Sequence, residues 1–443
     1  MSIQRVKINH YFCEGLTSRE QLSFTEKRAL EAEILSIKLD SKVKVDIEAA
    51  LTYLGQFVSH DILSSSTGRI HRSPFLNMQC LYGDGLLDQS NKIDDLGQFI
   101  IGNTTKDRKE DLLRKSNGEA FIPDSRNDEN LIISQLHLLF QKLHNWLVQK
   151  SSRYFSTREG RFESARTTLI LIYQTVIVTH FLKTILDDTV YETYFVNWVE
   201  PSRYNDNNFN IPLEFSHAAY RFGHSMIRNS YHLNRVKRDI SLRAIFENVG
   251  PATARNNVEL DDDFVIEWDQ LLSFDYNTSG NGGFQSALPI DFKVSRAMSE
   301  IPFIGSIMLR NIEAGERAKL PSGQDLLRQA LIQFETISSR IGLSQTSDLI
   351  PTKVKEVLEA MNLSQHTPLW VYFLSTTQEN GKKLGKFSSF IVAEIFSSAI
   401  HFADISIRKD HDSIIDEFDK AYKKYRYPGK ENKPLKLDAL FAL

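Results

Sequence analysis

The sequence predicts a mainly α-helical protein that forms one large domain. Apolar residues recur every three or four positions over long stretches, most clearly over 130–150 and 166–186, and strand-like alternation is scarce. With 443 residues, of which 41% are hydrophobic, the chain is long enough for a large core. It shows no repeat and no obvious linker, so we expect a single domain over residues 1–443.

Charge and cysteine content exclude several classes of protein. The 53 basic and 56 acidic residues nearly balance, which argues against nucleic acid as the main partner. Cys13 and Cys80 form neither a disulfide scaffold nor a zinc-ligand pattern. The first residues lack the apolar segment of a signal peptide, and the most apolar run, 167–182, is short for a bilayer span and is interrupted by Gln174 and His180. We expect a cytoplasmic protein without a membrane span.

The predicted helix over 51–62, LTYLGQFVSHDI, carries polar residues in an apolar pattern. Gln56 and His60 are four residues apart, so they project from one face of a helix, whereas Asp61 projects elsewhere. Taken alone, His60 is best interpreted as a buried histidine that bonds to a neighbour.

The next predicted helix begins near residue 126. Asp124 or Ser125 is the expected N-cap, followed by acidic residues in the first turn. This start places Arg126 and Glu129 one turn apart on the same face. Further along the helix, we interpret His137 and His144 as structural hydrogen-bonding residues.

Two later segments hold further polar residues in apolar surroundings. His224 follows Gly223 in FSHAAYRFGHSMI, and a glycine there would let a broad group approach the backbone. Asn311 lies in a helical stretch, where an asparagine is unfavourable unless it has a partner. Each of these features is weak evidence on its own.

Together, five blocks in this order resemble the animal-type haem peroxidases of the peroxidase–cyclooxygenase superfamily. The blocks are GQFVSHD (55–61), DSRNDENLIISQLHLLFQKLHN (124–145), PLEFSHAAYRFGHSMIR (212–228), RNIEAGERAKLPSGQ (310–324) and TPLWVYFL (367–374) with IVAEIF (391–396). The resemblance covers about residues 45–410, between N- and C-terminal extensions, and looks closest to bacterial members that lack a signal peptide.

The resemblance implies a helical fold with haem b between central helices. On the distal side of the haem, His60 matches the histidine that acts as general acid and base on peroxide. Arg126 matches the distal arginine that stabilises charge on the departing oxygen. Gln56 matches a distal glutamine associated with halide binding.

The resemblance also assigns the residues that hold the haem. His224 matches the proximal iron ligand, and Asn311 matches the residue that bonds the other ring nitrogen of that ligand. Arg221 matches an arginine near a haem propionate. Glu129 matches one of two residues that form haem esters in mammalian members, while Ser59 replaces the other, so at most one ester is expected.

The implied function is a haem peroxidase, which suggests a role in the response to oxidative stress. It would reduce hydrogen peroxide through ferryl intermediates and oxidise small aromatic donors or halides, with rates that fall below about pH 6.5, where an unshifted imidazole protonates. A haem-dependent fatty-acid oxygenase of the same superfamily is one alternative, but it needs a tyrosine where Arg221 stands, and Tyr220 should point differently. A non-catalytic haem-binding protein is the other, but it would leave His60 and Arg126 without a purpose.

A family calcium site is expected to be weakened or lost. Asp61 matches one carboxylate ligand. The best-matching loop, SPFLNMQ (73–79), offers Ser73, Phe75, Asn77 and Gln79, so a second carboxylate is missing. The alternative is that Asp61 pairs with a basic side chain or a backbone amide.

Overall fold

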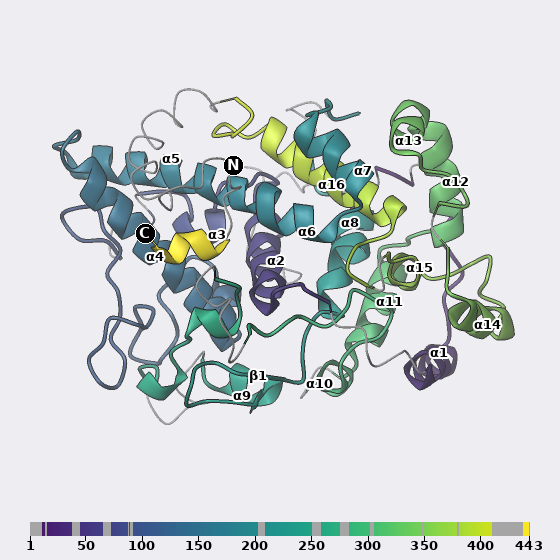
Figure 1. Cartoon of the computed structure of the whole chain (residues 1–443), viewed down its shortest axis with the longest axis horizontal. Coiled ribbons are helices and arrows are strands. Elements are labelled where there is room, and N and C mark those ends of the chain that lie inside the picture. Colours follow the sequence, from purple (N-terminus) through teal and green to yellow (C-terminus); the bar gives the residue numbers. More distant parts are fainter. Residues whose placement is uncertain are drawn as a thin grey trace, which may run out of the picture. The chain divides into compact units, whose positions relative to one another are not determined.

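Helices dominate this protein, as the sequence predicts (Figure 1). The computed structural model describes residues 11–13, 16–37, 45–64, 72–86, 88, 92–202, 209–249, 258–274, 283–301, 305–347, 349–378, 381–409 and 437–442. The regular strands among these residues are β1 (Ser230–Tyr231) and β2 (Ile240–Ser241), which form one antiparallel pair with Ser230 opposite Ser241. The mainly α prediction is therefore confirmed.

Contacts divide the chain into two compact units, each assembled from three separate segments. Unit 1 comprises residues 1–47, 182–229 and 286–398, and unit 2 comprises residues 48–181, 230–285 and 399–443. The single domain over 1–443 stays a prediction.

The elements of unit 1 are almost all helices. They are α1 (Phe24–Ser36), α6 (Lys183–Ile185), α7 (Asp188–Tyr191), the π-helix η3 (Glu192–Val196), α8 (Leu213–His217), the 3-10 helix η4 (Ala219–His224), α10 (Arg296–Ser299), α11 (Ile307–Arg317), α12 (Gly323–Gln333), α13 (Glu335–Ile341), α14 (Thr352–Ala360), α15 (Leu369–Ser375) and most of α16 (Lys386–His401).

Unit 2 contains the longest helices among the described residues. Besides β1 and β2, its elements are α2 (Ala49–Ile62), α3 (Gln79–Tyr82), the 3-10 helix η1 (Ser125–Asp128), α4 (Leu131–Ser151), α5 (Arg158–Val176), the π-helix η2 (Ile177–Leu182), α9 (Leu242–Glu247), and the 3-10 helices η6 (Asp262–Phe264), η7 (Trp268–Gln270) and η9 (Leu437–Ala442).

The core of unit 2 forms where α4 packs against α5 and α2 packs against α4 (Figure 1). Phe57 of α2 lies 4.8 Å from Phe140 of α4 and 5.9 Å from Tyr173 of α5, measured between ring centroids. All three rings are buried, and burying each stabilises the fold by about 2 kcal/mol. This cluster fixes α2, which carries Gln56 and His60.

The start of α4 differs from the prediction. Asp124 does act as a cap, but it caps the short η1, where its side chain accepts from the backbone N–H of Arg126. The α-helix begins only at Leu131, because the side chain of Asn130 accepts from the N–H of Ile133 and caps it there. Glu129 therefore lies at the C-terminal end of η1 and does not cap α4.

The most apolar run lies within a continuous helical stretch, Arg158–Ile185, which is long and apolar enough to cross a membrane by length and composition. However, 72% of its most apolar window is buried inside the protein. The fully buried Gln174 bonds to two backbone carbonyls, and the Nε2 of His180 lies 2.6 Å from the carboxylate of Glu48. Internal partners for these polar groups favour a core helix.

In unit 1, α8 and η4 lead to His224, and α11 packs against α8 and α15. The indole N–H of Trp370, on α15, donates to the backbone carbonyl of Arg221 at 3.2 Å. Ser306 caps α11 by accepting from the N–H of Leu309, which fixes the start of the helix that carries Asn311. These contacts place His224 and Asn311 side by side.

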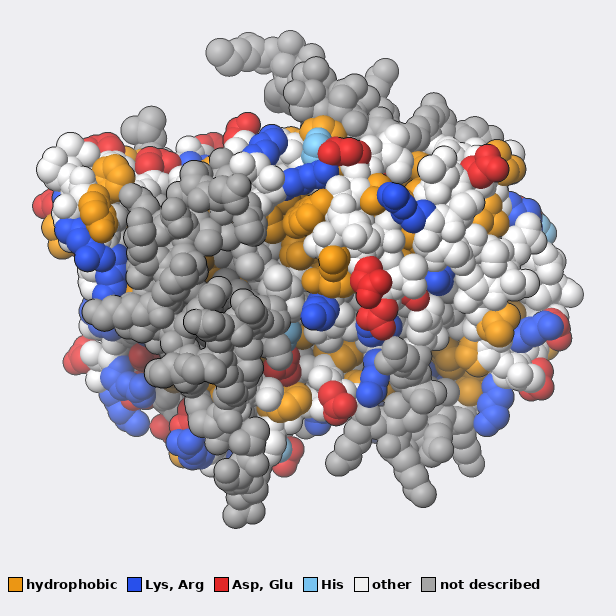
Figure 2. Space-filling view, turned by 45° about the horizontal axis from the view of Figure 1, so that its top comes forward, with side chains coloured by type: hydrophobic (Ala, Val, Ile, Leu, Met, Phe, Trp, Pro, Cys, Tyr) orange, Lys and Arg blue, Asp and Glu red, His pale blue; other side chains and the backbone are white. Residues whose placement is uncertain are grey.

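Charged side chains of both signs are interspersed over the described part of the surface shown in Figure 2. This distribution agrees with the nearly balanced composition of the chain.

Candidate functional site

Unit 2 brings the predicted distal residues together, and they are called the distal group here: Gln56, His60, Arg126 and Glu129. The first two project from the C-terminal half of α2, and the other two come from η1 and its end. Helix α2 contacts η1 directly, so residues that lie about 70 positions apart in the sequence become neighbours.

His60 is held through one ring nitrogen. Its Nδ1 lies 2.8 Å from the Oδ1 of Asn127, whereas its Nε2 has no partner among the described residues. The side chain is buried, at 7% exposure. Burial, and then the positive charge of Arg126, lowers the pKa of His60 to about 4. The imidazole is therefore neutral at physiological pH, with one nitrogen available.

Arg126 is oriented by a buried carboxylate. Its Nε and Nη2 donate to the two oxygens of Asp124 at 3.0 and 2.8 Å, and Nη2 also donates to the backbone carbonyls of His60 and Leu63. No described residue bonds to its Nη1. Arg72 donates to the same carboxylate at 2.7 Å, so Asp124 pairs with two guanidinium groups. These two charges hold the pKa of Asp124 below its usual range even though the carboxylate is fully buried.

Gln56 and Glu129 complete the distal group. The Oε1 of Gln56 accepts from the amide of Asn130 at 3.1 Å. Glu129 is accessible to solvent, and its carboxylate makes no hydrogen bond within the described ranges. Nearby protein atoms limit its hydration all the same, and this raises the pKa of Glu129 to about 7.

Asp61 points away from this group and is fully buried. Its two oxygens accept from the backbone N–H groups of Met78 and Cys80 at 3.0 and 3.4 Å. Burial raises the pKa of Asp61 to about 7. This is the backbone-amide arrangement given above as the alternative to a calcium ligand.

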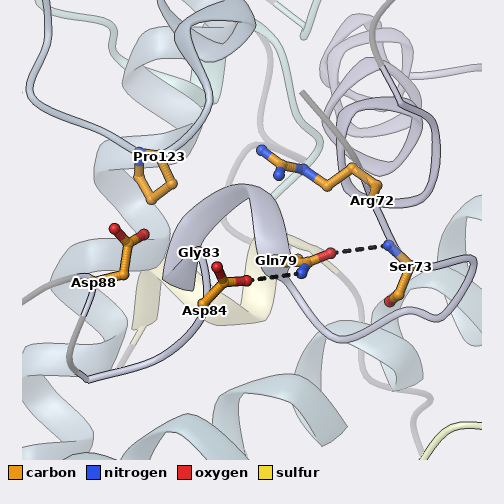
Figure 3. Close-up of a pocket in the computed structure, with 7 residues that line it drawn as sticks. All are labelled: Arg72, Ser73, Gln79, Gly83, Asp84, Asp88 and Pro123. Carbon is orange, nitrogen blue, oxygen red and sulfur yellow. Dashed lines mark hydrogen bonds between the residues drawn. The ribbon is translucent and has the colours of Figure 1, made fainter. Parts of the chain in front are cut away.

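The loop expected to complete the calcium site bonds to itself. The N–H of Ser73 donates to the Oε1 of Gln79, and the amide of Gln79 reaches Asp84 (Figure 3). The amide of Asn77 donates to the hydroxyl of Ser73, while its buried Oδ1 has no partner in the described part of the chain. Ser73, Gln79 and Asp84 border a polar cavity of about 410 Å³. Loss of calcium binding stays a prediction.

Unit 1 brings the predicted proximal residues together as a second group, here called the proximal group: His224, Asn311 and Arg221. The Nδ1 of His224 lies 3.2 Å from the Oδ1 and 3.0 Å from the Nδ2 of Asn311, which is fully buried. Arg221 donates from its Nη1 to the same Oδ1 at 3.1 Å and from its Nε to the carbonyl of Ser216. Asn311 thus joins the other two side chains.

Burial and the charge of Arg221 lower the pKa of His224 to about 4, so its ring is neutral. With its Nδ1–H donated to the Oδ1 of Asn311, the Nε2 of His224 would keep a lone pair for a metal ion. No described residue bonds to that Nε2.

Tyr220 packs among aromatic rings. Its ring stacks on Phe215 at 4.8 Å, with an angle of 10° between the planes, and it contacts Phe222 and Phe396. Burial raises its pKa well above 10. These ring contacts agree with the prediction that Tyr220 points differently, which stays a prediction, and position 221 holds an arginine.

Two features of the proximal group fit a haem. His224 offers an imidazole nitrogen without a partner among the described residues, and such a nitrogen is a common ligand of haem iron. A Cβ added to Gly223 would meet no atom within 4 Å, so the backbone next to His224 borders open space that a flat group could occupy.

Sequence reasoning missed Asn127 and Arg72, and it interpreted Asp124 only as a cap and His137 only as a structural residue. Each of these side chains bonds to the distal group or to a residue that does. The string DSRND offered the one available signal, because it places several hydrogen-bonding side chains next to Arg126. His144 is structural as predicted, since it bonds to the hydroxyl of Tyr82 and the carbonyl of Gly97.

Residues 78–278 match the family model described as animal haem peroxidase. This part of the chain is similar to animal haem peroxidases. It contains Arg126, Glu129 and His224, whereas Gln56, His60 and Asn311 lie outside the matched range.

Similar proteins agree with this assignment. Peroxidase mlt-7 of Caenorhabditis elegans is 26% identical over 182 residues, which cover 37% of this chain and 24% of that protein, so the chain spans about a quarter of its curated relative. Among solved structures, Peroxidase A from Dictyostelium discoideum has a TM-score of 0.61 at 14% identity and covers 97% of this chain and 92% of that one. A fatty acid alpha-dioxygenase of Arabidopsis thaliana has a TM-score of 0.55 at 11% identity, covering 95% and 81%. The chain therefore shares the helical fold of these peroxidase and dioxygenase structures.

Proposed function

We propose that this protein is a haem peroxidase that uses hydrogen peroxide to oxidise small aromatic donors. One observation carries the proposal: His60 and Arg126 are each anchored by all but one of their side-chain nitrogens. Nε2 of His60 and Nη1 of Arg126, to which no described residue bonds, are the acceptor and donor that peroxide cleavage requires.

The residues of the chain would divide the work as follows. His224 would hold the haem iron, with Asn311 orienting its ring, and the haem would supply the redox chemistry. The Nε2 of His60 would take the proton from one peroxide oxygen and return it to the other, which leaves as water. Arg126 would donate from Nη1 to the departing oxygen without losing its own proton. Gln56 would offer its amide N–H to a small anion, so halide oxidation is a second use of the same residues.

The haem would be retained mainly by the proximal group. Arg221 is bonded to Asn311, so its contribution to a propionate would come from its remaining N–H groups. Glu129 is the one carboxylate of the matched ester pair, since Ser59 has no carboxylate to contribute. We propose haem b as the cofactor, hydrogen peroxide and a small electron donor as substrates, and a cytoplasmic location.

Stopped-flow measurement of the reaction between peroxide and the haem-loaded protein tests the proposal. His60→Ala and Arg126→Ala should each slow this step by about 100-fold or more. His144→Ala is the matched control, because His144 is a buried histidine of the same unit that bonds elsewhere. Rates within a few-fold of the wild type for both variants would overturn the mechanism.

The fatty-acid oxygenase alternative is tested in parallel. Oxygen uptake with a long-chain fatty acid should stay at background, because the position three residues before His224 holds Arg221 and Tyr220 is packed among aromatic rings. Oxygen uptake that matches fatty-acid consumption, without turnover of aromatic donors, would favour the oxygenase.

A further inference from the structure

In unit 2, two buried side chains extend the hydrogen-bond network of His60. Asn127, in η1, and His137, on α4, both have no solvent exposure. The Oδ1 of Asn127 lies 2.8 Å from the Nδ1 of His60, and its Nδ2 lies 3.0 Å from the Nδ1 of His137. One carboxamide therefore joins two imidazole rings that lie 77 positions apart in the sequence.

The carboxamide of Asn127 decides which atoms donate and which accept in the hydrogen bonds from His60 to His137. An amide oxygen only accepts, so the Nδ1 of His60 must carry its ring proton, and Nε2 is left with a lone pair. An amide nitrogen only donates, so the Nδ1 of His137 must be unprotonated. Turning the amide by 180° would reverse both rings and put a proton on the Nε2 of His60. The orientation of one amide thus decides whether His60 presents a base.

His137 is suited to fix that orientation. It is neutral, because burial lowers its pKa to about 3, so its Nδ1 can act as an acceptor. Its ring is held in place against Phe57, edge to face, with 6.1 Å between centroids. Its Nε2 is buried without a partner among the described residues, which indicates that its position is set by the bond to Asn127 and by packing. The side chain of Asn127 also contacts the thiol of Cys80.

We propose that Asn127 is a positioning residue that locks His60 in the Nδ1–H tautomer, and that His137 holds the amide in the orientation this lock requires. The inference rests on the proposed function in one respect, namely that the lone pair on Nε2 is the base for peroxide. The tautomer itself is a property of the protein without haem.

The experiment reads the tautomer directly in the haem-free protein. Long-range ¹H–¹⁵N NMR of protein labelled at histidine nitrogens distinguishes protonated from unprotonated ring nitrogens, and His60→Ala identifies the signals of His60. The wild type should show a protonated Nδ1 and an unprotonated Nε2. Asn127→Leu, which removes both hydrogen bonds with little change of volume, should shift the tautomer ratio by about 10-fold toward Nε2–H. Asn127→Asp, which keeps an acceptor facing His60, should retain the Nδ1–H form.

The same variants loaded with haem give the kinetic readout. Asn127→Leu should slow the reaction with peroxide by about 10-fold or more, and Asn127→Asp should restore a large part of the rate. Asn145→Leu is the matched control. Asn145 lies on α4, where its Oδ1 accepts from the N–H of Phe99 and its Nδ2 donates to the carbonyl of Phe99. It makes no hydrogen bond to His60.

An Nε2–H tautomer in the wild type, or an unchanged tautomer ratio in Asn127→Leu, would overturn the inference. If Asn127→Leu does not fold, His137→Phe tests the same claim, because it frees the amide and should give a mixture of tautomers. If the tautomers behave as stated but the wild type does not react with peroxide, the positioning role stands and the proposed function fails.

Discussion

Asp124→Asn should destabilise the protein strongly, because the carboxylate of Asp124 is fully buried and accepts four N–H groups. Three come from the backbone N, Nε and Nη2 of Arg126, and the fourth comes from Nη2 of Arg72. An asparagine has one acceptor oxygen, and its NH₂ group would face guanidinium N–H groups in place of the other. Two charge-assisted bonds are lost at about 1.5–3 kcal/mol each, and two buried cations lose their counter-charge, so we expect a loss of about 3–5 kcal/mol.

Urea unfolding monitored by circular dichroism measures this loss, with Asp263→Asn as the matched control. Asp263 also has two basic partners, Lys106 at 3.4 Å and Lys237 at 3.9 Å, but its side chain is 46% exposed. The control should change the free energy of unfolding by less than about 1 kcal/mol. Equal, small effects for the two variants would refute the view that Asp124 is the buried counter-charge that orients Arg126.

Four further outcomes are expected. The peroxide reaction should keep its rate as the pH falls from 7 to about 5 and lose it through about pH 4, because the low pKa of His60 keeps the ring neutral; a decline centred near pH 6.5 in stopped-flow rates would show an unshifted imidazole. His224→Ala should abolish or sharply weaken haem retention on a desalting column, whereas His217→Ala, a nearby histidine bonded to a serine hydroxyl, should not. After limited peroxide, acid-denaturing chromatography with mass detection should show at most one haem ester, released in Glu129→Gln; haem still attached in that variant would point to another residue. Extensive dialysis should remove calcium, because both oxygens of Asp61 already accept backbone N–H groups, and stoichiometric metal that survives dialysis would contradict this.

Much of the fold and of the candidate site could be predicted from the sequence because they depend on local spacing. Gln56 and His60 share a helix face at a separation of four, and the apolar periodicity of 130–150 predicts α4 with an error at its N-terminal end. That error arose because five residues of types that cap helices, Asp124, Ser125, Asn127, Asp128 and Asn130, occur within seven positions. Asp124 caps a 3-10 turn first, and Asn130 then caps the α-helix.

The partners of the site residues could not be predicted, because they come from distant segments. Asn127 meets His60 only once α2 packs against η1, and Arg72 reaches Asp124 across 52 positions. The low pKa of His60 follows from burial and from the nearby Arg126, which are properties of the folded chain. The lowered pKa of His60 moves the expected loss of rate from about pH 6.5 to about pH 4, with the same sign.

The absorption spectrum of the purified, haem-loaded protein before and after one equivalent of hydrogen peroxide tests the central claim most directly. If the protein is a peroxidase whose haem is held by His224, the Soret band should shift within the stopped-flow time range and return when a phenolic donor is added. One donor radical should form for each electron taken up. A Soret band that stays unchanged with peroxide, or one that shifts and does not recover with any phenolic donor, would contradict it.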